Sequence, residues 1–351
     1  MTNQPAPRQR LICYDRLRIF AVVCVIVLHV SSAEWAHLAP ASFAWQVCNV
    51  YDSLVRFCVP VLFMISGVFF LDFERSYPLR KLYGHNILRL LTAYLFWAFA
   101  YAAIFQLIVA PEPSWSAFWH DLIYGHYHLW FILASIGLYM LVPFLRRICQ
   151  DRKTEEYFLL LSFLVVFAAG VLRLIPALSG WLDATLSKLH LEFVMGLTGY
   201  FMLGHYLKNY PPAPAVEIGA YVLGGLSLVV TILATSALSI RDGAGNSTLY
   251  AYLFPNTYFA SAAVFLLFQR FGRQLPRKRR TAGWIAQLSA DTFGVYLVHD
   301  FYITLLEALG LSATTFNPIF SIPVITALVA VLSLITVRLL AKIPGARRYI
   351  L

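Results

Sequence analysis

Long runs of apolar residues, separated by short polar segments, follow one another along this 351-residue chain. A helix that crosses a bilayer needs about 20 predominantly apolar residues. Only α-helices and closed β-barrels cross a bilayer, and these runs lack the period-two alternation of barrel strands, so the pattern predicts an all-α polytopic bundle. About ten transmembrane helices are expected, roughly at residues 17–36, 44–71, 87–110, 128–146, 157–177, 189–207, 216–239, 250–269, 286–309 and 318–341.

The composition agrees with a membrane protein and excludes several other classes. Hydrophobic residues make up 60% of the chain, charged residues 13%, and the mean hydropathy is +0.70. Soluble domains are about 45–50% apolar and about 25% charged, so a soluble fold, a disordered chain, a fibrous protein and a secreted disulfide scaffold are excluded. We expect a single transmembrane domain over residues 1–351, with no separate soluble domain. The odd number of cysteines and the lack of a CxxC pair favour core packing for Cys13, Cys24, Cys48, Cys58 and Cys149.

The placement of the basic residues behind the net charge of +10 indicates how the helices are oriented in the membrane. The 27 Lys and Arg residues lie in the N-terminal segment, the even-numbered loops and the C-terminal end, except for Arg56, Arg173, Lys188 and Arg241. The positive-inside rule therefore predicts cytoplasmic N- and C-termini in a multi-pass membrane protein. Membrane lipids are expected partners and nucleic acid is not. The basic cytoplasmic face is also compatible with binding of anionic headgroups or a phosphorylated ligand.

The first predicted helix combines a cation with a titratable group. Arg18 and His29 are eleven residues apart, which is almost three helical turns, so they share one face about 16 Å apart. Asp15 lies one turn before Arg18, and Arg16 is adjacent. An imidazole near the middle of the bilayer is a candidate general base, although a membrane histidine also commonly hydrogen-bonds a neighbouring helix.

Further polar residues interrupt the apolar runs. Arg56 lies near the middle of the second run, where a charge is costly, and Asp52 at i−4 is its expected partner. The pair serves either function or helix packing. Pro60 is expected to kink this helix. The other candidates are Ser66 on the same helix, His299 near mid-depth of the ninth helix, and His128 with Trp130 at the external start of the fourth. No metal-ligand spacing is found, so no metal is predicted.

Five motifs, in order along nearly the whole chain, resemble acyltransferase family 3, the integral-membrane acyltransferases that modify bacterial sugars. They are Tyr14-Asp15-Arg16-Leu17-Arg18 with His29, Arg56-x-x-x-Pro60 through Ser66-Gly67, His128-Leu-Trp-Phe131 with Tyr139 and Pro143, Tyr200 through Gly204, and Ser289 through His299. The chain most resembles the compact single-domain members, the enterobacterial common antigen O-acetyltransferase type.

The resemblance implies transfer of an acetyl group from cytoplasmic acetyl-CoA to a hydroxyl of an envelope glycan or lipid-linked sugar, such as an N-acetylglucosamine residue. It implies a location in the bacterial inner membrane. It implies no tightly bound cofactor, because acetyl-CoA is a co-substrate. Arg18, with Asp15 and Arg16, would bind the donor. His29 would act as base or as a covalent nucleophile, and Arg56, Ser66 or His299 would stabilise the oxyanion. His128, Trp130 and Asp52 would lie on the acceptor side.

Two other functions share these features. A glycan or lipid-linked sugar transporter or exporter also needs polar residues at mid-depth, but it does not need a cation aligned with a mid-depth histidine. Transfer of a succinyl or other acyl group in exopolysaccharide synthesis would use the same fold. Release of free CoA thiol from acetyl-CoA in the presence of a glycan distinguishes transfer from transport.

Overall fold

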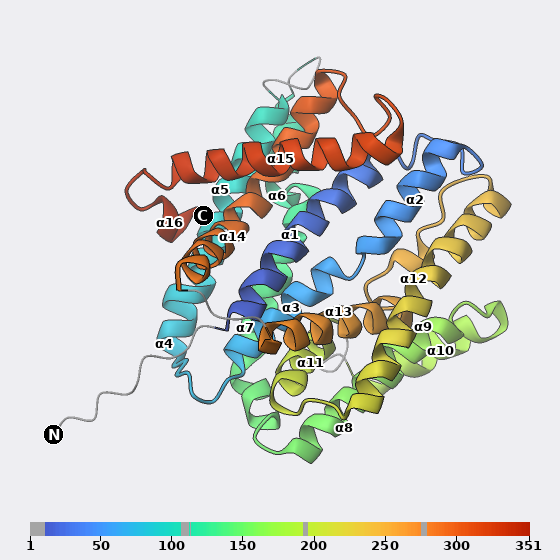
Figure 1. The fold of residues 1–351 in the computed structure, drawn as a ribbon, viewed down its shortest axis with the longest axis vertical. Helices are drawn as coiled ribbons and strands as arrows, with labels where there is room; N and C mark the ends of the chain where they lie inside the picture. Colours follow the sequence, from blue (N-terminus) through green and yellow to red (C-terminus); the bar gives the residue numbers. More distant parts are fainter. Residues whose placement is uncertain (1–10, 107–111, 113, 192–195, 275–278) are drawn as a thin grey trace.

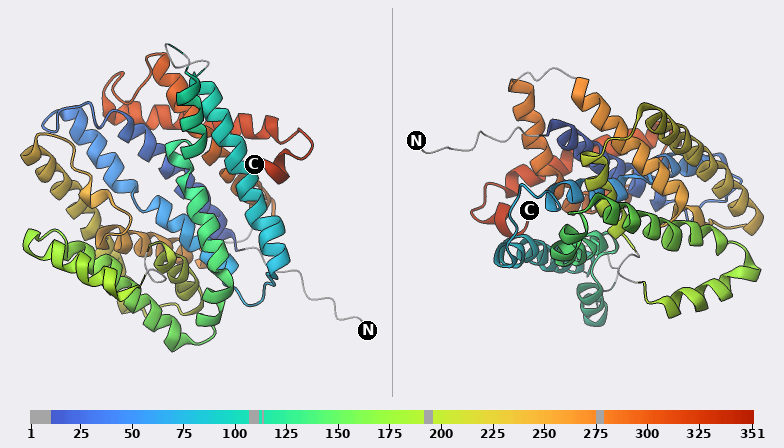
Figure 2. Two further views of the ribbon diagram at one scale, coloured as in Figure 1. Left: turned by 180° about the vertical axis from the view of Figure 1, so that it is seen from behind. Right: turned by 90° about the horizontal axis from the view of Figure 1, so that it is seen from below.

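The computed structural model describes residues 11–106, 112, 114–191, 196–274 and 279–351, and within these ranges it contains helices and no strand. Eight helical segments of this part are long and apolar enough to cross a membrane. The predicted class, a polytopic helical bundle, is therefore confirmed. Figures 1 and 2 show α1 (Ile12–Ala33) running through the bundle, where it packs against α2, α3, α13, α14 and α15.

The predicted second span is divided into α2 (Phe43–Val55) and α3 (Cys58–Phe70). The break lies at Arg56 and Phe57. A proline lacks the N–H that would donate to the carbonyl four residues earlier, and its ring crowds that carbonyl. For Pro60 that carbonyl belongs to Arg56, so the predicted kink is confirmed and is a break in the helix.

The third to fifth spans are made of several pieces. The third contains α4 (Leu79–Lys81), a π-helical segment (Leu82–Ile87) and α5 (Leu88–Ile104). The next contains α6 (Trp115–Tyr124), a 3₁₀ turn (Tyr127–Leu129) and α7 (Trp130–Ile148). The fifth contains α8 (Arg152–Ser162), a π-helical segment (Phe163–Ala168) and α9 (Ala169–Leu172). The helix α6 lies in a segment that the hydropathy pattern predicts as a loop.

The helix predicted for residues 189–207 is wrong in length. The structure has α10 (Pro176–Leu189), which is followed by His190 in the left-handed region at φ 48°, and α11 (Thr198–Asn209). Residues 192–195 lie outside the described ranges. A 12-residue helix is about 18 Å long, which is shorter than the apolar core of a bilayer at about 30 Å.

The remaining elements are close to their predicted positions. They are α12 (Pro214–Asp242), a 3₁₀ turn (Thr248–Tyr250), α13 (Pro255–Gln274), α14 (Arg279–Ala308), α15 (Pro318–Leu340) and α16 (Ala346–Tyr349). The ninth predicted span is α14, a 30-residue helix that is not among the eight described segments long and apolar enough to cross a membrane. The count of ten spans and the cytoplasmic termini stay predictions.

Helices α3 and α11 touch through their backbones. A Cβ atom on Gly67 would lie 1.7 Å from the carbonyl oxygen of Phe201, and one on Gly204 would lie 2.0 Å from that of Met64. Only glycine fits at either position. Small residues allow such close approach in membrane bundles, so α11 is fixed against the helix that carries Ser66.

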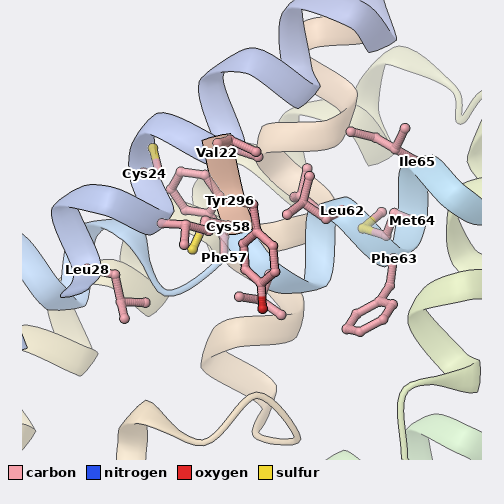
Figure 3. Packing of buried hydrophobic residues seen from close by; sticks show 14 of the residues in the cluster. Val22, Cys24, Leu28, Phe57, Cys58, Leu62, Phe63, Met64, Ile65 and Tyr296 are labelled. Atoms are coloured by element: carbon pink, nitrogen blue, oxygen red, sulfur yellow. The ribbon is translucent and has the colours of Figure 1, made fainter. Parts of the chain in front are cut away.

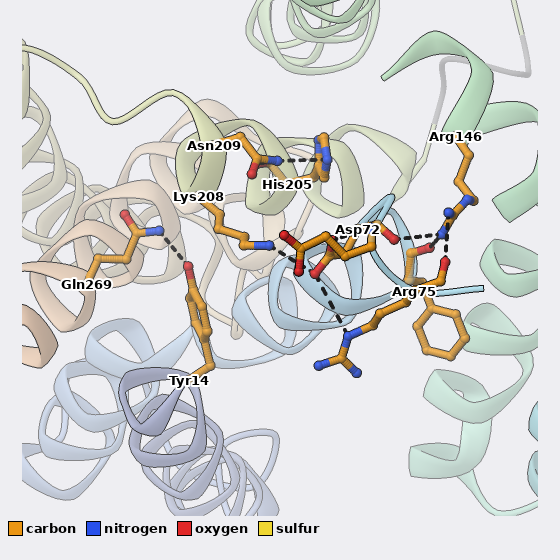
Figure 4. Close-up of polar contacts among 10 residues, drawn as sticks. Tyr14, Asp72, Arg75, Arg146, His205, Lys208, Asn209 and Gln269 are labelled. Carbon is orange, nitrogen blue, oxygen red and sulfur yellow. Dashed lines mark hydrogen bonds and ion pairs between the residues drawn. The ribbon is translucent and has the colours of Figure 1, made fainter. Parts of the chain in front are cut away.

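The loop that follows α3 is held by charged side chains from two other helices (Figure 4). Arg146 donates hydrogen bonds to the carbonyls of Phe70, Asp72 and Arg75, and Lys208 lies 3.2 Å from the Asp72 carboxylate. Burial acts to raise the pKa of the Asp72 carboxyl. The backbone N–H of Glu74 and the Lys208 ammonium outweigh this effect, so the pKa is lowered.

Candidate active site

Two histidines from the first and ninth predicted helices meet inside the bundle. Nδ1 of His29 on α1 lies 2.7 Å from Nε2 of His299 on α14, and the rings are stacked with centroids 4.9 Å apart. His299 is completely buried. The two candidate histidines, 270 residues apart in sequence, therefore form one imidazole pair.

The surroundings of His299 set the proton positions in this pair. Nδ1 of His299 lies 2.6 Å from the carbonyl oxygen of Tyr296, which only accepts, so this nitrogen carries the proton. In a neutral imidazole Nε2 is then an acceptor, and Nδ1 of His29 must donate to it. This arrangement leaves a bare lone pair on Nε2 of His29, the form that a general base or nucleophile requires.

A second polar group adjoins the pair. Nδ1 of His126 and Nδ1 of His128 are 2.8 Å apart, and Nε2 of His126 lies 3.4 Å from the Asp300 carboxylate. Tyr127 also donates to Asp300, at 2.5 Å. The ring centroids of His128 and His299 are 5.2 Å apart. Four imidazoles and one carboxylate are thus concentrated in one buried region.

His128 lies at the start of α7 as predicted, but it is buried inside the bundle. It is only 1% exposed, and its Nε2 has no hydrogen-bond partner among the described residues. The 3₁₀ turn before α7 directs it inward, and the Tyr296 hydroxyl donates to its carbonyl oxygen. The place of His128 at the external face of the membrane stays a prediction.

The predicted ion pair of Asp52 and Arg56 lies at the break between α2 and α3. Nη2 of Arg56 is 2.5 Å from the Asp52 carboxylate, and Asp52 is 1% exposed. The guanidinium also lies over the ring of Tyr250, 4.0 Å from its centroid. Nε of Arg56 is buried and has no hydrogen-bond partner in the described part of the chain, so one donor of this charged group is left over.

A cavity of about 500 Å³ is lined by residues of α1, α3, α5, α7, α14, α15 and α16. The guanidinium groups of Arg18, Arg89 and Arg347 line it, together with the carboxylate of Asp291. Arg18 lies 3.5 Å from the hydroxyl of Ser289, Arg89 donates to the backbone oxygen of Leu351, and Arg347 pairs with Asp291 at 3.2 Å. The volume is typical of small-molecule sites, and the charge favours an anion.

The cavity extends towards the imidazole pair along two neighbouring helices. On α1 it is lined by Arg18 and Val22, and His29 follows two turns after Val22. On α14 it is lined by residues from Ser289 to Tyr296, and His299 follows one turn later. The Tyr296 ring lies 5.7 Å from that of His299. Val22, Leu62 and Tyr296 belong to the buried cluster drawn in Figure 3. Tyr296 therefore forms a wall shared by the cavity and the histidines.

Comparison with known families agrees with this arrangement. The family model Acyl_transf_3, described as an acyltransferase domain, matches residues 11–338. The chain belongs to acyltransferase family 3. No curated protein and no solved structure matched in the corresponding searches. Membership makes the chain a multi-pass membrane acyltransferase, and the matched range contains both helices of the imidazole pair.

The remaining candidate residues of this acyltransferase differ in their relation to the cavity. Ser66 lines the cavity with Arg18, and its hydroxyl donates to the Leu62 carbonyl. Asp15 and Arg16 do not line the cavity. Trp130 is 39% exposed and stacks on Tyr252, with centroids 5.7 Å apart.

Several site residues of the acyltransferase were not predicted as such. Arg89 and Arg347 are part of the basic pattern that indicates orientation, and nothing in their local sequence points to a shared cavity. His126 and Asp300 carry a weak signal, since each lies next to or near a candidate histidine. Tyr296, within the Ser289–His299 motif, has the clearest signal.

Proposed function

We propose that this acyltransferase moves an acetyl group from cytoplasmic acetyl-CoA to a hydroxyl of an envelope sugar, in the manner of the enterobacterial common antigen O-acetyltransferase type, with an N-acetylglucosamine residue as acceptor. The observation that carries the proposal is the buried imidazole pair of His29 and His299 next to a cavity lined by three guanidinium groups. The cavity provides a binding region for a polyanion, and the pair provides a base.

Acetyl-CoA carries several phosphate charges at one end and its thioester at the other. Guanidinium groups bind phosphate through charge-assisted, often bidentate, hydrogen bonds. Arg18, Arg89 and Arg347 would hold the phosphates, and the thioester arm would extend past Ser66 towards Tyr296. Because Tyr296 closes this end of the cavity, its side chain has to move for the thioester to reach His29.

The chemical step is direct transfer. The acceptor hydroxyl attacks the thioester carbonyl carbon while Nε2 of His29 takes its proton. No positive charge therefore builds up on the acceptor oxygen as the new C–O bond forms. The C–S bond then breaks, and the CoA thiolate takes the proton from His29. His299 is a positioning residue here, because its Nε2 accepts from Nδ1 of His29 and keeps the reactive nitrogen free.

The developing oxyanion needs a hydrogen-bond donor that is not already used. The Ser66 hydroxyl donates to the Leu62 carbonyl, and the Nδ1–H of His299 to that of Tyr296. The buried Nε of Arg56 has no partner. A fixed charged donor in a buried site is the arrangement that stabilises such an anion most strongly, so we assign this role to Arg56.

Transfer by the purified protein is the direct test. In lipid nanodiscs with acetyl-CoA and a lipid-linked N-acetylglucosamine acceptor, we expect release of free CoA thiol and a gain of one acetyl mass on the acceptor. Acetylated protein accumulating before acceptor is added would replace direct transfer by a covalent acetyl-His29 route. Uptake or export of the glycan without thiol release would contradict the proposal in favour of transport.

Arg18→Gln is expected to weaken donor binding. Loss of a charged hydrogen bond to phosphate costs about 1.5–3 kcal/mol, which corresponds to a rise of about 10–100-fold in the KM for acetyl-CoA with little change in kcat. The control is Arg241→Gln, an exposed arginine outside the cavity. An unchanged KM in Arg18→Gln would remove this residue from the donor site.

A further inference from the structure

Three potential metal ligands from three parts of the chain meet away from the imidazole pair. Cys149 caps α7, Glu155 lies in the first turn of α8, and His205 lies on α11. Their side chains are 3%, 0% and 2% exposed. One donor atom from each, the Cys Sγ, a Glu oxygen and a His ring nitrogen, lies within 4.8 Å of the other two.

The hydrogen bonds in this cluster leave one charged atom unused. Nδ1 of His205 lies 2.8 Å from Oε1 of Glu155. The other carboxylate oxygen, Oε2, is buried and has no hydrogen-bond partner among the residues that the structure describes. A buried carboxylate is costly unless its lone pairs are paired or bind a metal, so this atom indicates a missing ligand. The Cys149 thiol lies within 4.8 Å of a carboxylate oxygen of Glu155, so one cation could contact both groups.

We propose that Cys149, Glu155 and His205 bind one zinc ion. Thiolate, imidazole and carboxylate are the ligands that zinc uses in proteins, at about 2.0–2.3 Å, which places the donor atoms about 3.3–3.6 Å from one another. From a group within 4.8 Å, small side-chain rotations reach this geometry. The fourth position of the tetrahedron is left for water.

The neighbour of His205 fits the outer contact that metal-bound histidines make. The side-chain amide of Asn209 lies 2.8 Å from Nε2 of His205 (Figure 4), whereas Glu155 contacts the other ring nitrogen, Nδ1. With Nδ1 bound to zinc, Nε2 carries the proton and needs an acceptor. The Asn209 amide nitrogen also donates to the backbone oxygen of His205 at 3.1 Å. On zinc binding the amide would give up this bond and turn its oxygen towards Nε2, and such outer hydrogen bonds hold a ligating imidazole in place.

The zinc site would stabilise the fold and would not take part in the reaction. It joins the end of α7 and the start of α8 to α11, and α11 touches α3 through Gly67 and Gly204. The helix α3 contributes Ser66 to the cavity wall. Zinc is therefore expected to stabilise the part of the bundle on which the cavity rests, without contact with the reacting groups. This inference does not depend on the proposed donor or acceptor.

Metal analysis of the purified protein is the test. The full chain, expressed with added zinc and carrying no histidine tag, is expected to hold one zinc per chain by plasma mass spectrometry. Cys149→Ser and His205→Gln are expected to lose it. The matched control is Cys13→Ser, which removes a cysteine outside the cluster and is expected to keep the metal.

A second measurement on the wild-type chain covers the case in which the variants do not fold. After removal of metal by a chelator, added Co²⁺ is expected to give a thiolate-to-cobalt charge-transfer band, and added Zn²⁺ to raise the Tm. Zinc content equal in Cys149→Ser and wild type would overturn the proposal. So would a wild-type chain that holds no zinc and gives no cobalt band, in which case the cluster is a buried hydrogen-bonded pair.

Discussion

Replacement of His29 by glutamine is expected to reduce acetyl transfer by about 10²–10⁴-fold, the range that general acid–base catalysis contributes. Glutamine keeps much of the side-chain volume and still donates to Nε2 of His299, but it has no nitrogen that takes a proton. The fall should appear in kcat and leave the KM for acetyl-CoA nearly unchanged, because His29 does not line the cavity. The measurement is thiol release in nanodiscs at saturating donor.

The matched control is His120→Gln on α6, where the histidine side chain is 67% exposed. This variant is expected to retain wild-type activity. His299→Gln separates positioning from catalysis, since an amide oxygen restores an acceptor for Nδ1 of His29. We expect a smaller loss of kcat in His299→Gln than in His29→Gln. Wild-type rates in His29→Gln, with normal folding, would refute the assignment of the base.

The bilayer explains why much of the fold could be predicted from the sequence. A spanning helix has to satisfy its own backbone and be apolar over its length, so hydropathy alone indicates most helices. The pattern fails where a segment does not cross as one straight helix. The left-handed residue His190 and the short helix α11 have no signal in hydropathy, and neither does α6, whose aromatic residues also suit a loop at the membrane surface.

The relative position of two site residues was predictable where both residues lie on one helix or in one motif. The eleven-residue spacing of Arg18 and His29 and the i, i+4 spacing of Asp52 and Arg56 follow from helical geometry. The burial of His128 depends on a turn that the local sequence does not specify. The meeting of Arg18 with Arg89 and Arg347 depends on how three distant helices pack, and the spacing of residues along one helix carries no information about this.

The burial of the Asp52–Arg56 pair leads to the second large expected effect. Removal of one partner leaves the other as an uncompensated buried charge, which costs about 3–5 kcal/mol, whereas replacement of both by apolar residues of similar size is often neutral. Asp52→Leu alone is therefore expected to lower the Tm in detergent strongly and to reduce the yield of folded protein. The double variant Asp52→Leu/Arg56→Met is expected to recover most of the Tm.

The double variant separates the structural role of the pair from a role in catalysis. If Arg56 stabilises the oxyanion, the folded double variant binds acetyl-CoA with the wild-type KM but loses about 10²–10³-fold in kcat, the cost of removing one such donor. The matched control is Arg173→Met, which removes an arginine paired with an exposed aspartate outside the cavity. A double variant with both normal Tm and normal kcat would show that the pair only fixes the break between α2 and α3, and the oxyanion donor would then have to be sought among the groups around His128.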